Sequence, residues 1–179
     1  PICSIKNHAR TIEVEDRRQD VLAALQWLRA QPNVDTSRIG LLGWSHGAMT
    51  VLSAINTKRS TYAHPLAGAA VFYPGCREPL KNLMGVDTPL LMQLGAKDDW
   101  TAPGPCIELA KRLKSETGAD VTVQMYADSY HGFDGPGPVR FRSDVPNGVA
   151  STGVHVGGNP VARAQALAAL DTFFRRIFE

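Results

Sequence analysis

The chain has 179 residues, of which 44% are hydrophobic and 20% are charged, and its formal net charge is +2. This composition is typical of a single globular domain, and a weak charge spread among acidic and basic residues does not favour a nucleic-acid partner. No apolar run approaches the roughly 18 residues that a membrane span needs, so we expect no membrane partner. The three cysteines and five histidines show no metal-ligand spacing, which argues against a bound metal.

Helical and extended patterns alternate along the chain. An amphipathic helix is predicted over 16–30, and a short apolar strand over 38–43 runs into a turn at 44–47 that a second helix follows. Further strands are predicted over 66–73, 89–94 and 121–126, and further helices over 105–115 and 160–179. This alternation predicts one α/β domain over 1–179, with a mostly parallel sheet that is flanked by helices.

The spacing of apolar residues also predicts which side of the later helices is buried. In the helix over 105–115 this side carries Ile107, Ala110 and Leu113. In the last helix it carries Val161, Leu167, Leu170, Phe174 and Ile177.

The turn at 44–47 belongs to a G-x-S-x-G motif, Gly43-Trp44-Ser45-His46-Gly47, placed between a predicted strand and a predicted helix. We expect a sharp turn that exposes the Ser45 hydroxyl, and we expect both glycines to be required because a side chain at either would collide with neighbouring backbone. The following helix directs its N-terminal N–H groups to the same point, so the backbone N–H of His46 is the predicted oxyanion-hole donor. The alternative is a chance serine in a glycine-rich turn.

A serine hydroxyl needs a base to remove its proton, and the base needs an acid that orients it. In the α/β-hydrolase fold the acid and the histidine follow the serine, in that order, in loops after later strands. Asp98 and Asp99 follow the strand that ends at Gly95, and His131 follows the strand over 121–126. We therefore predict an α/β-hydrolase fold in which Ser45, Asp98 and His131 are the nucleophile, the acid and the base.

Two alternatives remain at these positions. Asp99 could be the acid instead, or it could cap the turn toward Pro103. His131 could be a surface histidine, although the remaining histidines, His8, His64 and His155, do not follow a strand in this way.

Three aromatic residues, Trp44, Tyr73 and Trp100, stand beside the predicted catalytic positions. We expect them to line an apolar substrate pocket, or else to pack in the core. The segment 135–159 is rich in Gly and Pro and shows no period, so we predict a lid or rim loop over the site, with a disordered surface excursion as the alternative. Arg140 and Arg142 would make this rim basic, which suits an anionic substrate if they are not simply solvated.

Cys76 follows one predicted strand and Cys106 begins the helix after the next, so both belong to neighbouring connections. A disulfide between them is possible, and it would place the protein in the periplasm or outside the cell. Three reduced thiols in the cytoplasm are the alternative.

Three segments together, Gly-Trp-Ser-His-Gly at 43–47, Gly-Ala-Lys-Asp-Asp-Trp-Thr at 95–101 and Tyr-His-Gly-Phe at 130–133, resemble the dienelactone hydrolase family. The resemblance covers most of the chain from the first helix onward. It implies cleavage of small-molecule esters or lactones by a nucleophile, an Asp and a His, without a metal or cofactor. The founding members use a cysteine where this chain has Ser45, which favours a general esterase over activity on dienelactone itself.

Full-length members of that family also have several strands ahead of the first helix. We therefore expect an N-terminally incomplete chain, in which a missing segment or a homodimer partner covers the sheet edge beside the Ser45 strand, and we assign no second oxyanion donor. The predicted function is a serine hydrolase of esters or lactones. A prolyl-oligopeptidase-like peptidase and a catalytically silent binding or scaffold protein are the alternatives.

Overall fold

A computed structural model describes residues 12–59 and 66–179. Its helices and strands alternate, as the sequence predicts, and the boundaries of the predicted elements differ by at most three residues. They are α1 (Val14–Arg29), β1 (Gly40–Trp44), α2 (His46–Ala54), β2 (Gly68–Phe72), α3 (Arg77–Lys81), β3 (Leu90–Gly95), α4 (Gly104–Arg112) with a π-helical turn (Leu113–Thr117), β4 (Val121–Tyr126), β5 (Arg140–Arg142), β6 (Val154–Val156) and α5 (Pro160–Phe178).

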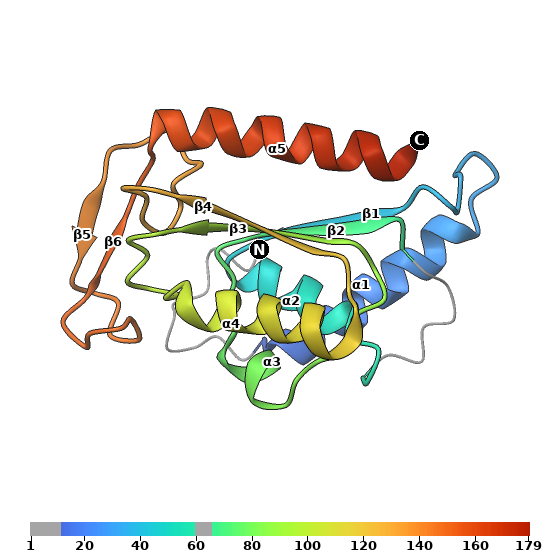
Figure 1. Ribbon diagram of the computed structural model, residues 1–179, viewed down its shortest axis with the longest axis horizontal. Helices are drawn as coiled ribbons and strands as arrows, with labels where there is room; N and C mark the ends of the chain where they lie inside the picture. Colours follow the sequence, from blue (N-terminus) through green and yellow to red (C-terminus); the bar gives the residue numbers. More distant parts are fainter. Residues whose placement is uncertain (1–11, 60–65) are drawn as a thin grey trace.

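The strands β1 to β4 form a parallel sheet in chain order. Helix α5 covers one face of this sheet, and the helices α1 to α4 lie on the other (Figure 1). The predicted fold class, a parallel sheet flanked by helices, is confirmed. Because the strands are parallel, their carboxyl ends meet at one edge, where functional side chains of such sheets gather. Within the described residues no helix is long and apolar enough to cross a membrane.

The core is divided by the sheet. Every residue of β3 is buried, because helices cover it on both faces. The larger cluster, between the sheet and α1 to α4, includes Leu25, Leu52 and Leu109, whereas smaller clusters under α5 include Phe72 and Phe173.

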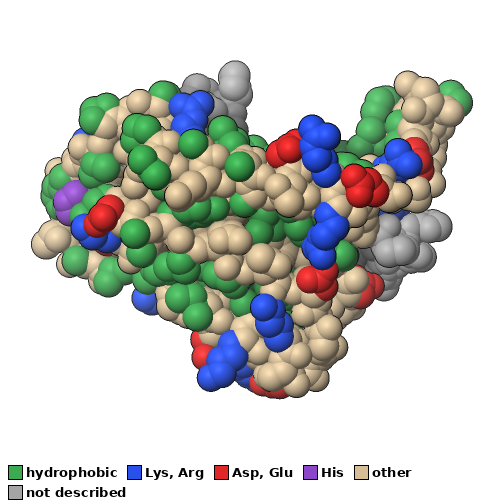
Figure 2. All heavy atoms as spheres, turned by 45° about the horizontal axis from the view of Figure 1, so that its top comes forward, with side chains coloured by type: hydrophobic (Ala, Val, Ile, Leu, Met, Phe, Trp, Pro, Cys, Tyr) green, Lys and Arg blue, Asp and Glu red, His purple; other side chains and the backbone are tan. Residues whose placement is uncertain are grey.

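The predicted buried side of α5 is wrong in part. Val161 is 67% exposed and Leu167 48% exposed, and the buried residues of the helix are Ala162, Ala166 and Phe173. Small alanine side chains let the first turns of α5 approach the sheet closely, so in these turns Ala162 and Ala166, and not Val161 or Leu167, face the core. Figure 2 looks onto the side of the molecule where α5 lies, and hydrophobic side chains are spread over its middle.

The predicted side of α4 is wrong at one position. Ile107 is 44% exposed, and the side chains that enter the core are Cys106, Leu109 and Ala110. The predicted Ala110 and Leu113 are buried, and Cys106, which is bonded to Cys76, takes the place expected for Ile107.

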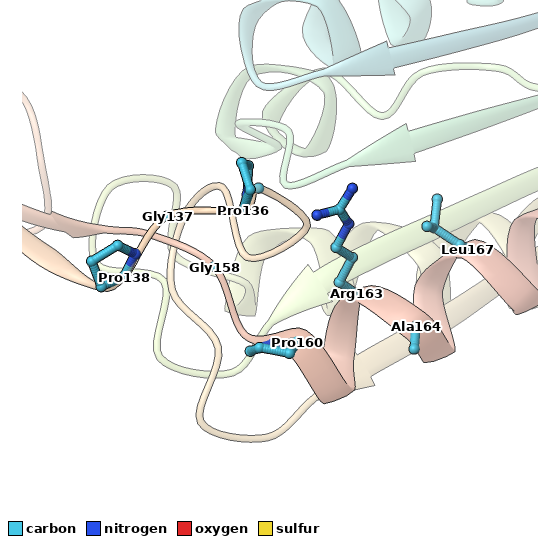
Figure 3. A pocket seen from close by; sticks show the side chains of 9 residues that line it. Pro136, Gly137, Pro138, Gly158, Pro160, Arg163, Ala164 and Leu167 are labelled. Atoms are coloured by element: carbon cyan, nitrogen blue, oxygen red, sulfur yellow. The ribbon is translucent and has the colours of Figure 1, made fainter.

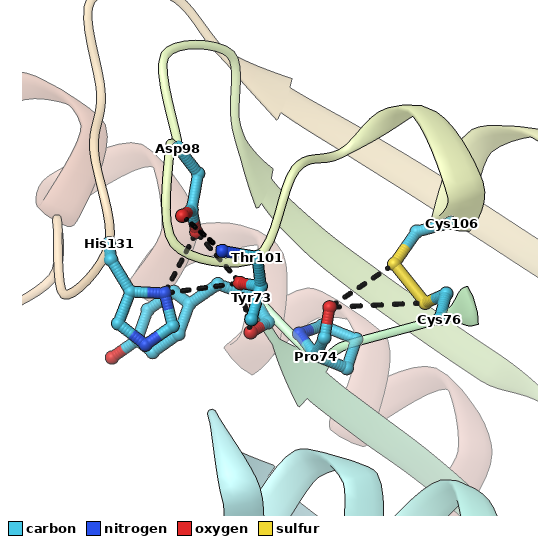
Figure 4. The surroundings of a disulfide bond; sticks show 7 residues. All are labelled: Tyr73, Pro74, Cys76, Asp98, Thr101, Cys106 and His131. Carbon is cyan, nitrogen blue, oxygen red and sulfur yellow. Dashed lines mark hydrogen bonds and ion pairs between the residues drawn. A yellow bond between two sulfur atoms is a disulfide. The ribbon is translucent and has the colours of Figure 1, made fainter. Parts of the chain in front are cut away.

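These two cysteines form a disulfide, which the sequence had left open. The bridge joins the loop after β2 to the first turn of α4, and both cysteines are almost fully buried (Figure 4). It therefore links two connections that leave the carboxyl edge of the sheet.

Strand β1 lies at the edge of the sheet. Its only strand partner among the described residues is β2, as we expected for the Ser45 strand. Leu42 and Trp44 on β1 are 37% and 43% exposed. An edge of this kind presents unpaired backbone N–H and C=O groups and favours pairing with another segment.

The segment 135–159 contains more regular structure than its sequence suggests. Strands β5 and β6 pair antiparallel within it, and we call them the β5–β6 ribbon. Strands of three residues are too short to show an alternating pattern. Several glycines here serve close packing: Gly157 has φ 151°, and a side chain on it would collide with the carbonyl of Pro138.

The disulfide yields the first prediction. Replacing Cys76 and Cys106 together by Ala removes a cross-link between residues 30 apart in sequence, which should lower the free energy of unfolding by about 3 to 4 kcal/mol. Urea unfolding of the two proteins measures this difference. Independently, unreduced denatured protein should show one reactive thiol per chain, and three reactive thiols would contradict the bridge.

Candidate active site

The turn between β1 and α2 holds Ser45 in an unusual backbone conformation. Ser45 has φ 51° and ψ −118°, a region that costs a non-glycine residue about 1–3 kcal/mol. Its N–H donates to the Phe72 carbonyl over 3.0 Å, and its own carbonyl accepts from the N–H of Met49 over 3.0 Å. These bonds fix the strained turn and leave the Ser45 side chain at the carboxyl edge of the sheet.

The two glycines of the motif differ, which corrects the sequence prediction. A Cβ on Gly43 would lie 2.5 Å from the carbonyl oxygen of Gly47, closer than real Cβ atoms approach. A Cβ on Gly47 would have no atom within 4 Å. Gly43 is required because the backbone of Gly47 packs directly against it. At Gly47 itself a side chain would meet no neighbour, so glycine is not required there.

The structure brings Ser45, His131 and Asp98 together. The His131 Nε2 lies 2.9 Å from the Ser45 Oγ, and the His131 Nδ1 lies 2.9 Å from the Asp98 Oδ2. His131 and Asp98 are 5% and 4% exposed, so little water competes for these bonds. With the Nδ1–H donated to the Asp98 carboxylate, the Nε2 is left to accept the serine hydroxyl proton.

The Asp98 carboxylate is fixed by its own loop (Figure 4). Its Oδ1 accepts the backbone N–H groups of Trp100 and Thr101 over 2.9 and 2.8 Å. The Thr101 hydroxyl lies 3.0 Å from the Asp98 Oδ2 and 3.1 Å from the His131 Nδ1. Thr101 was not singled out from the sequence, and its place three residues after Asp98 is the signal that could have found it.

The alternative roles considered for Asp99 do not match its contacts. Asp98, not Asp99, accepts the N–H groups that close the turn before Pro103. The Asp99 carboxylate accepts the backbone N–H of His155 over 2.8 Å and lies 2.7 Å from the ring Nδ1 of the same residue. Asp99 therefore contacts the ribbon and not His131.

Two of the three aromatic candidates flank the base. The ring centroids of Tyr73 and Trp100 lie 4.5 and 4.8 Å from that of His131. Tyr73 has φ 40°, and its carbonyl accepts from the Thr101 hydroxyl over 3.0 Å. The Tyr73 ring is buried and packs against His131. Of the two roles expected for Tyr73, packing in the core therefore fits better than lining a substrate pocket.

Asp134 lies in the loop 127–134 after β4, which also carries His131 and which we call the base loop. Its carboxylate links Tyr73 to Trp44. The Asp134 carboxylate accepts the Tyr73 hydroxyl over 2.7 Å and the Trp44 indole N–H over 2.8 Å. Burial, and then the hydrogen bond to Asp134, raise the pKa of Tyr73 well above its ordinary value, so this hydroxyl stays a donor. Trp44 stacks on Phe72 and is 43% exposed. Asp134 was missed from the sequence, although it lies only three residues after His131.

The imidazole of His46 contacts α1. The Arg17 guanidinium lies 2.7 Å from the His46 Nδ1, and since arginine can only donate, this nitrogen accepts. The backbone N–H of His46 opens α2 directly after Ser45.

A pocket of about 370 Å³ adjoins His131. Its wall is formed by Trp100, by residues of the ribbon and by glycines in the loops on either side of the ribbon. Its lining comprises Trp100, His131, Gly132, Gly135, Gly137, Pro138, Arg140, Arg142, Val156, Gly157 and Gly158. Trp100 is thus the aromatic candidate that lines this pocket, and both predicted rim arginines lie in its wall.

Arg142 is engaged within the wall. It bonds the Asp144 carboxylate and lies over the Trp100 ring, 5.9 Å from its centroid. A second pocket, of about 400 Å³, lies between the first turns of α5 and the loop that carries Pro136 and Pro138, and Arg163 extends across it (Figure 3).

Within residues 12–59 and 66–179, no cluster of three or more His, Cys, Asp or Glu side chains could hold a metal ion. His8 and His64 lie outside the described residues.

Solved structures with the same fold include a dienelactone hydrolase-like promiscuous phosphotriesterase from metagenomic libraries, at TM-score 0.66 and 20% identity over 92% of this chain and 63% of that one. A thermophilic esterase of Thermogutta terrifontis with bound propionate matches at TM-score 0.69 and 18% identity, over 93% of this chain and 67% of the other. Dipeptidyl peptidase 4 of Porphyromonas gingivalis matches at TM-score 0.55 and 20% identity, over 69% of this chain and 20% of the peptidase. The chain spans about two thirds of the length of the first two.

The parallel sheet, the elbow at Ser45 and the loops at its carboxyl edge define an α/β-hydrolase. Residues 5–178 match the dienelactone hydrolase family, and the chain belongs to that family.

The difference between the two glycines gives the second prediction. Gly43→Ala should destabilise the protein by about 1–3 kcal/mol, because its Cβ must displace the backbone of the first turn of α2. Gly47→Ala should leave the thermal midpoint unchanged or slightly raised, since alanine favours a helix and meets no neighbour. Thermal unfolding of both variants by circular dichroism compares them, and equal losses at the two positions would contradict this account.

Proposed function

We propose that the chain is the catalytic part of a serine hydrolase that cleaves carboxylic esters or lactones through an acyl-enzyme. The proposal depends above all on the chain of bonds from Ser45 Oγ through His131 to Asp98, each of 2.9 Å. Membership of the dienelactone hydrolase family supports the ester or lactone substrate class.

In this mechanism the Ser45 oxygen attacks the substrate carbonyl carbon while its proton moves to the His131 Nε2. Asp98 keeps the proton of the His131 Nδ1 in place and stabilises the imidazolium. The oxygen of the tetrahedral intermediate takes the negative charge next to the backbone N–H of His46 and the positive end of α2.

The intermediate collapses when His131 returns the proton to the leaving alkoxide oxygen, which breaks the ester bond and leaves the acyl group on Ser45. Water then attacks the acyl carbon and gives its proton to the His131 Nε2. The second intermediate expels the Ser45 oxygen, which regains the proton, and the carboxylic acid leaves. In a lactone the alcohol and the acid remain in one molecule.

The pocket beside His131 is the proposed substrate site, with Trp100 as an apolar wall and the ribbon as its rim. Its size of about 370 Å³ suits a small molecule. Trp44 and Tyr73 act through Asp134 on the shape of the site.

A peptidase is a second candidate, because 69% of this chain is similar in fold to part of a dipeptidyl peptidase. Hydrolysis of dipeptide p-nitroanilides that exceeds hydrolysis of p-nitrophenyl butyrate would favour it. A scaffold without activity would hydrolyse neither.

We further propose that the edge of β1, which has no second strand partner within residues 12–59 and 66–179, is covered in the working protein by another segment or by a second copy of this chain. Exposed Leu42 and Trp44 support this, because an uncovered apolar edge favours association. Gel filtration combined with intact mass should show a larger chain or a dimer. A stable, active monomer of 19.4 kDa would contradict the proposal.

Ester hydrolysis gives the direct test of the function. Ser45→Ala should lower kcat for p-nitrophenyl butyrate by about ten thousandfold or more, because the nucleophile is lost while binding is retained. Ser37→Ala is the matched control, since Ser37 is an exposed serine that bonds Asp35 ahead of β1, at the opposite end of that strand from Ser45, and it should keep full activity. Equal activity of both variants would mean that the hydrolysis does not use Ser45.

A further inference from the structure

Asp99 is adjacent to the proposed acid, yet its side chain serves another part of the molecule. Its Oδ1 accepts the backbone N–H of His155 over 2.8 Å, and its Oδ2 lies 2.7 Å from the ring Nδ1. Its own carbonyl accepts the N–H of Val149 over 2.7 Å. Asp99 belongs to the loop 96–103 after β3, which we call the acid loop. This one residue therefore bonds the segment 135–159 at two points, His155 and Val149.

The His155 ring is also packed from other directions. Its centroid lies 4.9 Å from that of Tyr130, next to His131, and 5.0 Å from that of Phe141 on β5. The ring cannot turn away from Asp99 without losing these contacts. Asp99, Tyr130 and the two strands of the ribbon thus form one fixed assembly, with the acid loop on one side and the base loop on the other.

The same ribbon forms the wall of the substrate pocket. The N–H of Gly157 donates to the His131 carbonyl over 3.1 Å, so β6 runs beside the base loop. Val156, Gly157, Arg140 and their neighbours line the pocket together with Trp100, which follows Asp99 in the chain. Any shift of the ribbon relative to the acid loop changes the width of this pocket.

We infer that Asp99 is a positioning residue that holds the β5–β6 ribbon in place as one wall of the substrate pocket. It acts on substrate binding through His155, while its neighbour Asp98 acts on bond cleavage through His131. The inference rests on the proposed function, and it assigns two separate tasks to two consecutive aspartates.

Substitutions by alanine and by asparagine at position 99 distinguish the hydrogen bonds of Asp99 to His155 from an effect of its negative charge. Alanine leaves the His155 N–H without its acceptor. Asparagine can accept that N–H with its oxygen, and its amide can donate to the ring Nδ1 once the ring proton lies on Nε2. Asp99→Ala should raise KM for p-nitrophenyl butyrate by about tenfold and change kcat by less than about threefold, whereas Asp99→Asn should restore most of the affinity.

Asp98→Asn is the contrasting variant. It should lower kcat by about ten thousandfold, because an amide at this position stabilises the wrong tautomer of His131. Asp128→Asn is the matched control. Asp128 pairs with Lys97 on the surface between the same loops and does not touch the ribbon, so both constants should stay within about twofold of wild type.

The outcomes are distinct. An unchanged KM in Asp99→Ala, a loss of kcat as large as that of Asp98→Asn, or a failure of Asp99→Asn to restore affinity would each overturn the inference. If Ser45→Ala keeps its activity, the proposed function fails instead, whatever happens at position 99.

Discussion

The His131 imidazole is the group on which the rest of the site depends, because it has to be bonded correctly on both sides at once. Its Nδ1 faces Asp98 and its Nε2 faces Ser45, each at 2.9 Å. The three residues come from connections after β1, β3 and β4. A parallel sheet brings these connections to one edge. The fold therefore brings the three residues near one another, and contacts within the loops set the distances between their side chains.

Several contacts besides the bonds to Ser45 and Asp98 hold the His131 imidazole in its orientation. Tyr73 and Trp100 enclose its ring, and Thr101 donates its backbone N–H to the Asp98 carboxylate and its hydroxyl to the Tyr73 carbonyl. The disulfide starts three residues after Tyr73 and ends five residues after Thr101, so it joins the two loops that carry these contacts. Hydrogen bonds thus hold the residues around the base, and the disulfide joins the loops that carry them, as precise catalytic geometry requires.

The sequence predicts the parts of the site that depend on local chain geometry. The elbow at 43–47 and the places of Asp98 and His131 follow from strand ends, and the structure brings these residues together. It does not predict contacts between distant loops: Asp99 meets His155 across 56 residues, and Trp44 meets Asp134 across 90. Such pairs depend on the course of loops that have no period of their own.

The errors in the helices have a related origin. Apolar spacing identifies an amphipathic helix, but the sheet beneath decides which part of its apolar surface is buried. In α5 the alanines at 162 and 166 face the sheet, and Val161 and Leu167 are exposed. Close packing selected the small residues, a choice that depends on the sheet as much as on the helix.

The central claim is that Ser45 is activated by His131, and covalent labelling tests it most directly. The intact protein is treated with a fluorophosphonate, and the modified peptide is identified by mass spectrometry. We expect one adduct per chain, on the Ser45 oxygen, and none after His131→Ala, in which the serine keeps its position but loses its base. Unlabelled folded protein, or an adduct on another residue, would contradict the account.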